Sequence, residues 1–303
     1  MSFDLFFCRR EPERIDFEAV AKWGDTIGYF RREGNQLWYQ NPDTGVYFSI
    51  GYAPMPPDDP EESPVPADCN DTGLSFNLNY NRASFFGYEA IPVVSRLVQD
   101  FNLAIYNPQA GEDAQGVRYG VDAQSLLNSW LDHNRRATSA LSQQRAASLD
   151  HMPRAKSLRM WRYMSQKKDL EQRFADEGTF VPKIVPLQHK GAHELELGFV
   201  CSEGVYCLVP AVDWVFIVRA RKGLSKSKRN SEVGIISYTT FLELMGHLLE
   251  PFDGENVKQI RRESAEKMTK IVRRFDLPDN RGDFKLAGMD SFIDSEIADA
   301  ASS

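Results

Sequence analysis

The N-terminal third of the chain carries a regular pattern of hydrophobic and polar positions. Alternation with period two predicts strands, and apolar residues spaced three and four apart predict helices. We expect strands at 3–8, 73–80 and 103–106, a hairpin over 36–52, and helices over 12–23 and 88–101. The order β-α-β-β-β-α-β is typical of an α+β sandwich with helices on one face of a mainly antiparallel sheet.

The turn inside the hairpin is the clearest local signal. Pro42 presets the backbone for a type I turn, and Asp43 suits the position after it. Gly45 can adopt the left-handed conformation that closes a bulged hairpin. The turn is therefore specified, although it indicates no chemistry.

Helical spacing dominates the middle of the chain, and strands return after it. Asp122 can cap one helix, and Pro153 can start a second in which Leu158, Trp161 and Met164 form a core stripe. Short strands are expected at 180–187, 193–200, 205–209 and 214–219. A helix over 242–249 and a helix begun by Asp253 and carrying Val257 to Phe275 should follow.

These elements predict an α+β protein with two small, mainly antiparallel sheets and packed helices, joined by a helical connector. The expected boundaries are an N-terminal α+β domain at 1–120, the connector at 121–178, a C-terminal α+β domain at 179–276 and a flexible tail at 277–303.

Composition places the 303-residue chain among ordinary globular proteins, with 42% hydrophobic and 26% charged residues. The formal net charge of −7 makes nonspecific attraction to nucleic acid or anionic lipid weak. A basic protein partner fits this charge better, and nucleic acid is an unlikely partner.

The four cysteines, Cys8, Cys69, Cys201 and Cys207, have neither zinc-ligand nor redox-pair spacing, so we expect reduced thiols. Asp4 interrupts the first apolar run, which does not suit a secretory signal. No segment approaches the roughly 20 apolar residues that span a bilayer. A cytoplasmic protein without a membrane partner is predicted.

No constellation of residues identifies a reaction. His189 and His193 with Glu194 come nearest to a metal site, but Gly191 between them indicates a loop rather than a shared helix face. Cys201 has no indicated imidazole partner, and P-loop, dinucleotide and Gly-x-Ser-x-Gly patterns are missing. We expect no catalytic residue, metal or cofactor. The alternative is an unrecognised enzyme or small-ligand domain around His189, His193, Glu194 and Asp213.

Basic residues concentrate at 135–173 and 219–229, where they could contact phosphates while Trp161 or Tyr163 stacks on a base. This pattern defines a second alternative, a nucleic-acid-associated regulator. Overall acidity and helical spacing favour solvated helix faces instead.

Residues 54–71 combine prolines with carboxylates and lack the apolar content to pack, which indicates a mobile acidic loop. Such a loop can occupy a basic site on another protein. With aromatic residues of the preceding hairpin it forms the predicted partner-binding set: Trp38, Tyr39, Tyr47, Asp58, Asp59, Glu61 and Glu62.

Five segments resemble an uncharacterised group of bacterial cytosolic proteins: 3–7, 41–48, the helix from Glu89 to Phe101, 106–109 and 209–215. Some members of that group resemble immunity proteins, which are encoded beside polymorphic or type VI secreted toxins and protect the producer by binding the toxin. The resemblance implies a non-enzymatic protein that neutralises a cognate toxin by occluding it. It transfers no site residue.

Overall fold

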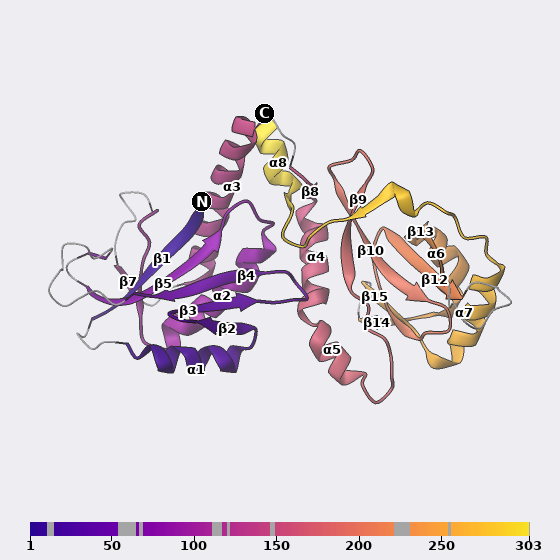
Figure 1. The fold of residues 1–303 in the computed structure, drawn as a ribbon, viewed down its shortest axis with the longest axis horizontal. Coiled ribbons are helices and arrows are strands. Elements are labelled where there is room, and N and C mark those ends of the chain that lie inside the picture. The colour runs from indigo at the N-terminus through magenta and orange to yellow at the C-terminus, as the bar shows by residue number, and fades with distance from the viewer. Residues whose placement is uncertain are drawn as a thin grey trace. The chain divides into compact units, whose positions relative to one another are not determined.

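The chain divides into two compact units. Unit 1 comprises residues 1–149 and 292–303, and unit 2 comprises residues 150–291 (Figure 1). The computed structural model describes residues 1–10, 15–53, 65–66, 69–110, 117–119, 122–145, 149–220, 231–253 and 256–302.

Unit 1 is built on a seven-stranded sheet in the order β2-β3-β4-β5-β1-β6-β7, in which every pair is antiparallel. Its strands are β1 (Ser2–Arg9), β2 (Phe30–Glu33), β3 (Gln36–Gln40), β4 (Tyr47–Tyr52), β5 (Asn70–Asn79), β6 (Ala104–Tyr106) and β7 (Val117–Tyr119). The additional short strand β17 (Ile293–Asp294) follows much later in the chain.

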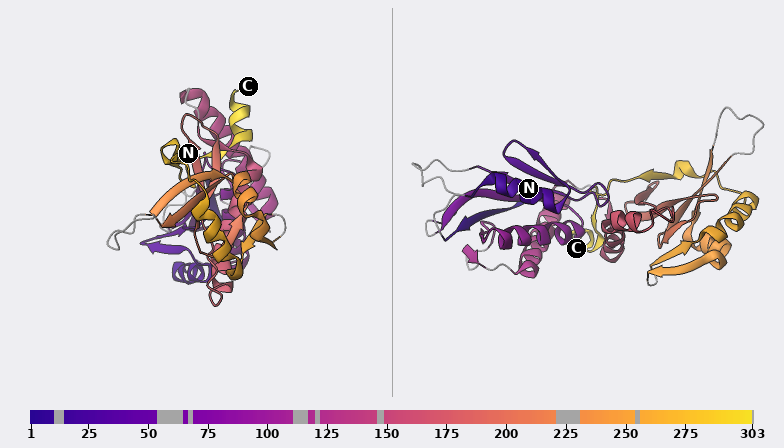
Figure 2. Two further views of the ribbon diagram at one scale, coloured as in Figure 1. Left: turned by 90° about the vertical axis from the view of Figure 1, so that its right-hand side faces the viewer. Right: turned by 90° about the horizontal axis from the view of Figure 1, so that it is seen from below.

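Helices gather on one face of this sheet, as the right-hand view in Figure 2 shows for α2 and α3. They are α1 (Phe17–Ile27), α2 (Phe85–Asp100), α3 (Ala123–Arg145) and α8 (Ser295–Ser302). Alternate strand residues such as Leu5, Phe48 and Phe76 bury their side chains beneath these helices. Trp130 of α3 packs over Gly87 of α2, where an added Cβ would lie 2.5 Å from the indole ring.

The structure confirms most of the predicted strands and helices of this part, with several differences. Helix α1 begins at Phe17, after its N-cap Asp16, and not at residue 12, and strand β7 was not predicted. Helix α2 begins at Phe85, so Pro92 lies in its interior and not in its first turn. Strand β2 was missed because three of its four side chains are exposed and charged, which leaves no alternation to detect. Gly45 has the expected left-handed backbone, with φ of 72°.

Unit 2 contains a five-stranded sheet in the order β13-β12-β10-β9-β16 and a three-stranded sheet in the order β11-β15-β14. The strands are β8 (His151–Met152), β9 (Ile184–His189), β10 (Leu195–Ser202), β11 (Cys207–Pro210), β12 (Trp214–Ala220), β13 (Ser231–Ser237), β14 (Leu249–Asp253), β15 (Val257–Ile260) and β16 (Phe284–Leu286). Strands β10 and β12 pair in parallel.

The helices of unit 2 bury mainly aliphatic and sulfur-containing side chains, including Met160, Met164, Met245 and Met268. They are α4 (Arg154–Ser165), α5 (Lys167–Arg173), α6 (Tyr238–Met245) and α7 (Arg262–Arg274), with short 3₁₀ turns η3 (Gly246–Leu248) and η4 (Arg281–Asp283). The predicted helix from Asp253 is wrong in its first part, because Val257 and Ile260 lie on β15. Their three-residue spacing fits one helical turn, but a four-residue strand whose first and last residues are both buried has the same spacing.

The protein is a mixed α+β protein, but the prediction of two small sheets is wrong. Seven and five strands form the main sheets because edge strands with mostly exposed side chains, such as β2 and β16, extend them.

Residues 121–178 do not form one connector in this structure. Helix α3 belongs to unit 1 and helices α4 and α5 to unit 2, since each buries its own apolar stripe in a different core. The expected tail is also ordered over much of its length. Phe292 is buried against Phe85, and the buried Asp294 accepts a hydrogen bond of 3.0 Å from the Ser84 backbone N–H at the start of α2.

Candidate functional site

Only one of the three predicted aromatic anchors is exposed. Trp38 has 37% of its surface accessible on β3. Tyr39 points the opposite way into the core and donates a hydrogen bond of 2.8 Å to Glu89 Oε1. Tyr47 is half-buried, its ring contacts Phe86, and its hydroxyl accepts a hydrogen bond from Arg82. Tyr39 is therefore a structural residue, and Trp38 is the available anchor.

Trp38 lies on the sheet face opposite the helices. Strand register aligns it in one row with Ser49, Asn77 and Asp4, because directly paired residues point to the same side. The neighbouring row holds Gln36, Gly51, Ser75 and Phe6. We call this set of eight residues the open face. Trp38 is the exposed large ring of this set, and its direct cross-strand neighbours are Arg31 of β2 and Ser49, of which Ser49 is buried.

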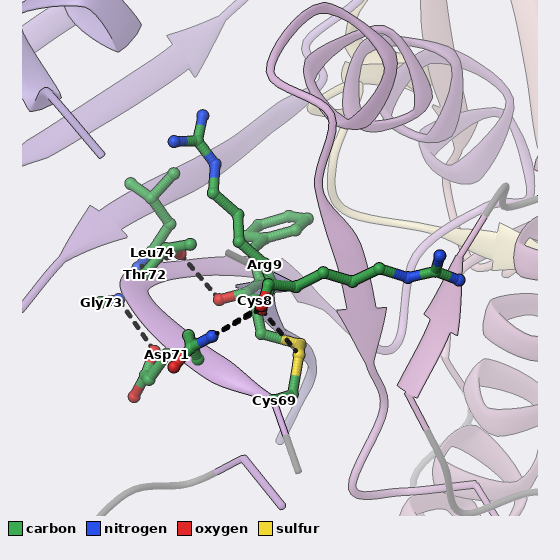
Figure 3. Close-up of a disulfide and its surroundings, with 10 residues drawn as sticks. Cys8, Arg9, Cys69, Asp71, Thr72, Gly73 and Leu74 are labelled. Atoms are coloured by element: carbon green, nitrogen blue, oxygen red, sulfur yellow. Dashed lines mark hydrogen bonds between the residues drawn. A yellow bond between two sulfur atoms is a disulfide. The ribbon is translucent and has the colours of Figure 1, made fainter. Parts of the chain in front are cut away.

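A disulfide anchors a loop segment on the same side. Cys8 of β1 is bonded to Cys69, 61 residues later, with Cα atoms 6.0 Å apart (Figure 3). Both cysteines form a small buried cluster with Val65 and Ala104, against which Phe6 and Tyr106 pack. Since Phe6 belongs to the open face, the end of the acidic stretch is fixed beside that face.

The residues after Cys69 return directly into β5. Thr72 Oγ1 donates a hydrogen bond of 2.7 Å to the Phe7 carbonyl oxygen, and Asp71 accepts one of 2.8 Å from the Gly73 backbone N–H (Figure 3). Asp58, Asp59, Glu61 and Glu62, the other predicted partner-binding residues, lie outside the described residues.

Glu89 organises the hairpin turn from beneath. Its Oε1 accepts hydrogen bonds from Tyr39, from Asn41 Nδ2 at 2.9 Å and from Thr44 Oγ1 at 3.1 Å. Burial and the adjacent Glu89 carboxylate raise the pKa of Tyr39 far above its usual range. The turn that was clearest in sequence is thus held by a carboxylate 45 residues further along the chain.

Comparisons with known proteins identify no family for this chain. No family model, curated protein or solved structure matches it. Within the described part of the chain, no helix combines the length and apolar character needed to cross a membrane.

The weak histidine cluster does not come together as a metal centre. His193 Nδ1 lies 3.3 Å from Asp150, whereas the His189 ring packs against Phe284. Asp213 is used elsewhere: it pairs with Lys156 at 3.0 Å and accepts the Leu197 backbone N–H at 2.7 Å. In the ranges that the structure covers, no group of three His, Cys, Asp or Glu side chains can hold a metal ion.

The prediction that all four cysteines are reduced thiols is wrong. Cys8 and Cys69 form the disulfide, while Cys201 and Cys207 are free and buried in unit 2. A hydrogen bond to the Cys201 thiol, together with burial, raises the pKa of Cys207. The disulfide was missed because its spacing carries no signal, and only the pairing of β1 with β5 brings the two residues together.

The basic middle region is divided between the two units. Arg135 and Arg136 belong to unit 1, and the residues from Arg154 onward belong to unit 2. Tyr163 is buried, and its hydroxyl donates a hydrogen bond of 3.0 Å to the Pro182 carbonyl oxygen, so it cannot stack on a base. Trp161 is half-buried, and Met160 and Tyr163 take the core positions predicted for Leu158 and Trp161.

Proposed function

We propose that this protein is a non-enzymatic protein-binding protein that engages its partner through the open face of unit 1. One observation carries the proposal: Val65 and Cys69, which lie in the C-terminal part of the predicted acidic loop, pack against Phe6 on the same sheet face that exposes Trp38. A large exposed ring on a sheet face that carries polar side chains matches the aromatic anchor and polar rim of protein interfaces.

The partner we propose is a protein with a basic surface. Asp58, Asp59, Glu61 and Glu62 concentrate negative charge within five residues of sequence, which favours rapid encounter with a cationic site. Following the resemblance given above, the partner is a secreted toxin domain and this chain is the immunity protein that occludes its active site.

Affinity capture from a lysate of the native organism, quantified by mass spectrometry, tests this proposal with four full-length baits. They are the wild type, Trp38→Ala, a variant with all four of the named acids changed to Lys, and Phe180→Ala. Phe180 provides the matched control because it is an exposed aromatic residue of unit 2, with 47% of its surface accessible.

A partner of the open face should be retained by the wild type and by Phe180→Ala. Retention should fall about thirtyfold for Trp38→Ala, the effect of losing one hot-spot residue. The captured protein, expressed alone, should then be toxic and should be neutralised by the wild type. A stoichiometric partner held equally by all four baits would exclude the open face, and a bait without any partner would exclude protein binding as the function.

The disulfide bears on where the protein works. Disulfides persist in oxidising compartments and are rare in the cytosol. The Cys8–Cys69 bond therefore weighs against the predicted cytoplasmic location, which stays a prediction. Alkylation of free thiols before cell lysis, followed by peptide mass spectrometry, reports whether these two residues are bonded in the cell.

A further inference from the structure

Unit 2 contains a cavity of about 560 Å³, within the size range of small-molecule sites. It lies where the end of α5, strand β14 and the start of α7 meet. Nothing in the protein-binding proposal uses this cavity, and its lining differs in charge from the acidic segment of unit 1.

Three guanidinium groups line the cavity, against two carboxylates from Glu177 and Glu263. Arg173 is held over the rings of Phe174 and Phe252, at 5.6 and 5.2 Å from the ring centroids. Arg261 is ion-paired with Glu250 at 2.8 Å. Arg262 has no ion-pair or hydrogen-bond partner among the described residues, so its charge is available to a ligand.

Backbone donors add to this positive character. Helix α7 begins at Arg262, and the side chain of its N-cap residue Arg261 makes no capping hydrogen bond. The Ser264 N–H donates to the Arg261 carbonyl oxygen at 3.0 Å, whereas those of Arg262 and Glu263 have no acceptor among the described residues. These two N–H groups and the helix dipole make the terminus favourable for an anion. A helix terminus alone would not define a site, however, since most termini are satisfied by water.

Thr179 supplies an independent indication. Its side chain is 8% exposed and lines the cavity, yet its hydroxyl has no hydrogen-bond partner in the part of the chain that the structure describes. The hydroxyl oxygen is not among the buried side-chain atoms that are sealed from solvent without a partner, so it opens on the cavity, where water or a ligand can reach it. A ligand oxygen or its water would satisfy this group.

We propose that this cavity binds a phosphate monoester of a small polyhydroxylated molecule. A phosphate dianion offers acceptor oxygens in several directions, which suits Arg262, the α7 terminus and Arg173 better than the two oxygens of a carboxylate. Glu177 and Glu263 can accept hydrogen bonds from hydroxyl groups of the ligand. They also disfavour a more highly charged polyphosphate.

Isothermal titration calorimetry with the full chain tests the proposal. The probes are inorganic phosphate, glucose 6-phosphate and adenosine monophosphate, with glucose and adenosine as partners that lack the phosphate. At least one monoester should bind in the micromolar range, and its unphosphorylated parent should not. Comparing the affinities for glucose 6-phosphate and adenosine monophosphate shows whether the phosphate is recognised on a sugar or on a nucleotide. Inorganic phosphate measures the contribution of the phosphate group alone.

Variants then assign the binding to this cavity. Arg262→Gln should weaken the monoester by about tenfold or more, the effect of one lost charge-assisted hydrogen bond. Thr179→Val, which keeps the side-chain shape, should weaken it about fivefold. Arg274→Gln is the matched control, since it removes an exposed arginine from the opposite end of α7.

The proposal is overturned if no monoester binds the wild type below about 1 mM, or if the monoester binds Arg262→Gln and Thr179→Val as tightly as the control. Thermal unfolding of each variant excludes misfolding as the cause of a loss. If Arg262→Gln fails to fold, Thr179→Val still decides the outcome. Binding must also survive in Trp38→Ala, so this test and the capture experiment fail separately.

Discussion

The main sheets of the two units differ in the face that their helices leave uncovered. In unit 1 that face presents polar side chains such as Gln36 and Asn77, with Trp38 as its exposed large ring. The register of unit 2 places Val200 and Phe216 side by side on the corresponding face, and Val200 is 42% exposed.

This difference teaches that exposure alone is a poor guide to function. Scattered exposed apolar residues are normal, so Val200 among other apolar residues needs no partner to explain it. Trp38 stands out because its neighbours are polar and offer hydrogen bonds around it. The sharper candidate site in unit 2 is instead the arginine-lined cavity, whose volume suits a small ligand rather than a protein.

The largest expected effect tests whether the two cores are independent. Phe76→Ala in unit 1 and Phe199→Ala in unit 2 each remove a fully buried ring, and each should lower the free energy of unfolding by about 3–5 kcal/mol. Hydrogen exchange with peptide resolution should show lost protection in the mutated unit only. If either substitution lowered hydrogen-exchange protection equally in both units, the two units would unfold together as one cooperative core.

The next effect concerns the disulfide, which only unit 1 has among the described cysteines. Changing Cys8 and Cys69 together to Ser should lower the free energy of unfolding by about 2–4 kcal/mol, because the bond closes a long loop in the unfolded chain. The denatured protein should show two free thiols before reduction and four after it. Four thiols without reductant would contradict the bond.

A smaller effect is expected at the hairpin. Glu89→Gln keeps one acceptor oxygen but removes the charge that draws three donors, so the free energy of unfolding should fall by about 1–2 kcal/mol. The exposed Glu33→Gln in the same unit serves as the control and should change stability by less than about 0.5 kcal/mol. Equal effects would show that Glu89 has no special role in the turn.

The smallest effect depends on pH and lies in unit 2. Glu203 is 12% exposed and pairs with Arg273 at 3.1 Å. Burial opposes ionisation, but the hydrogen bonds from Arg273 and the Ala220 N–H and the positive charges of Arg273 and Arg219 together outweigh it, so the pKa of Glu203 is lowered. A lowered folded-state pKa means that the stabilisation is complete above the unfolded value of about 4.5 and is lost as pH falls through the folded value.

Glu203→Gln should therefore cost about 0.5–1 kcal/mol at neutral pH, since its arginine partner is exposed. Chemical denaturation of both proteins between pH 7 and pH 3 should show this difference shrinking toward acid. A difference that grows on acidification would reverse the assigned sign.

Sequence patterns predicted unit 1 better than unit 2 for a physical reason. In β5, Leu74, Phe76 and Leu78 alternate with polar residues because one face of the sheet is solvated. In β10, Gly198 is buried between the buried Leu197 and Phe199, and the alternation is weakened. The short spacing of Val257 and Ile260 was accordingly misread as helical.

The candidate sites depended on contacts that no local pattern records. The turn at Pro42 to Gly45 follows from its own residues, but the Glu89 carboxylate that holds it comes from another element. Likewise, the cavity joins Arg173, Thr179 and Arg262 from three separate segments. Strand alternation places Trp38 and Tyr39 on opposite faces of the sheet, but only the structure shows which of the two faces the helices cover and therefore that Trp38 is the exposed residue.

The capping of α2 by Asp294 has a consequence for the order in which the protein can be completed. Ribosomes add residues from the N-terminus, so every residue of unit 2 has been synthesised before Asp294 is added. Until then, α2 lacks the carboxylate that receives its Ser84 N–H, and Phe85 lacks the Phe292 ring. The unit whose sequence starts first is therefore the unit that finishes last, and unit 2 is an insertion that nascent unit 1 must accommodate before it closes.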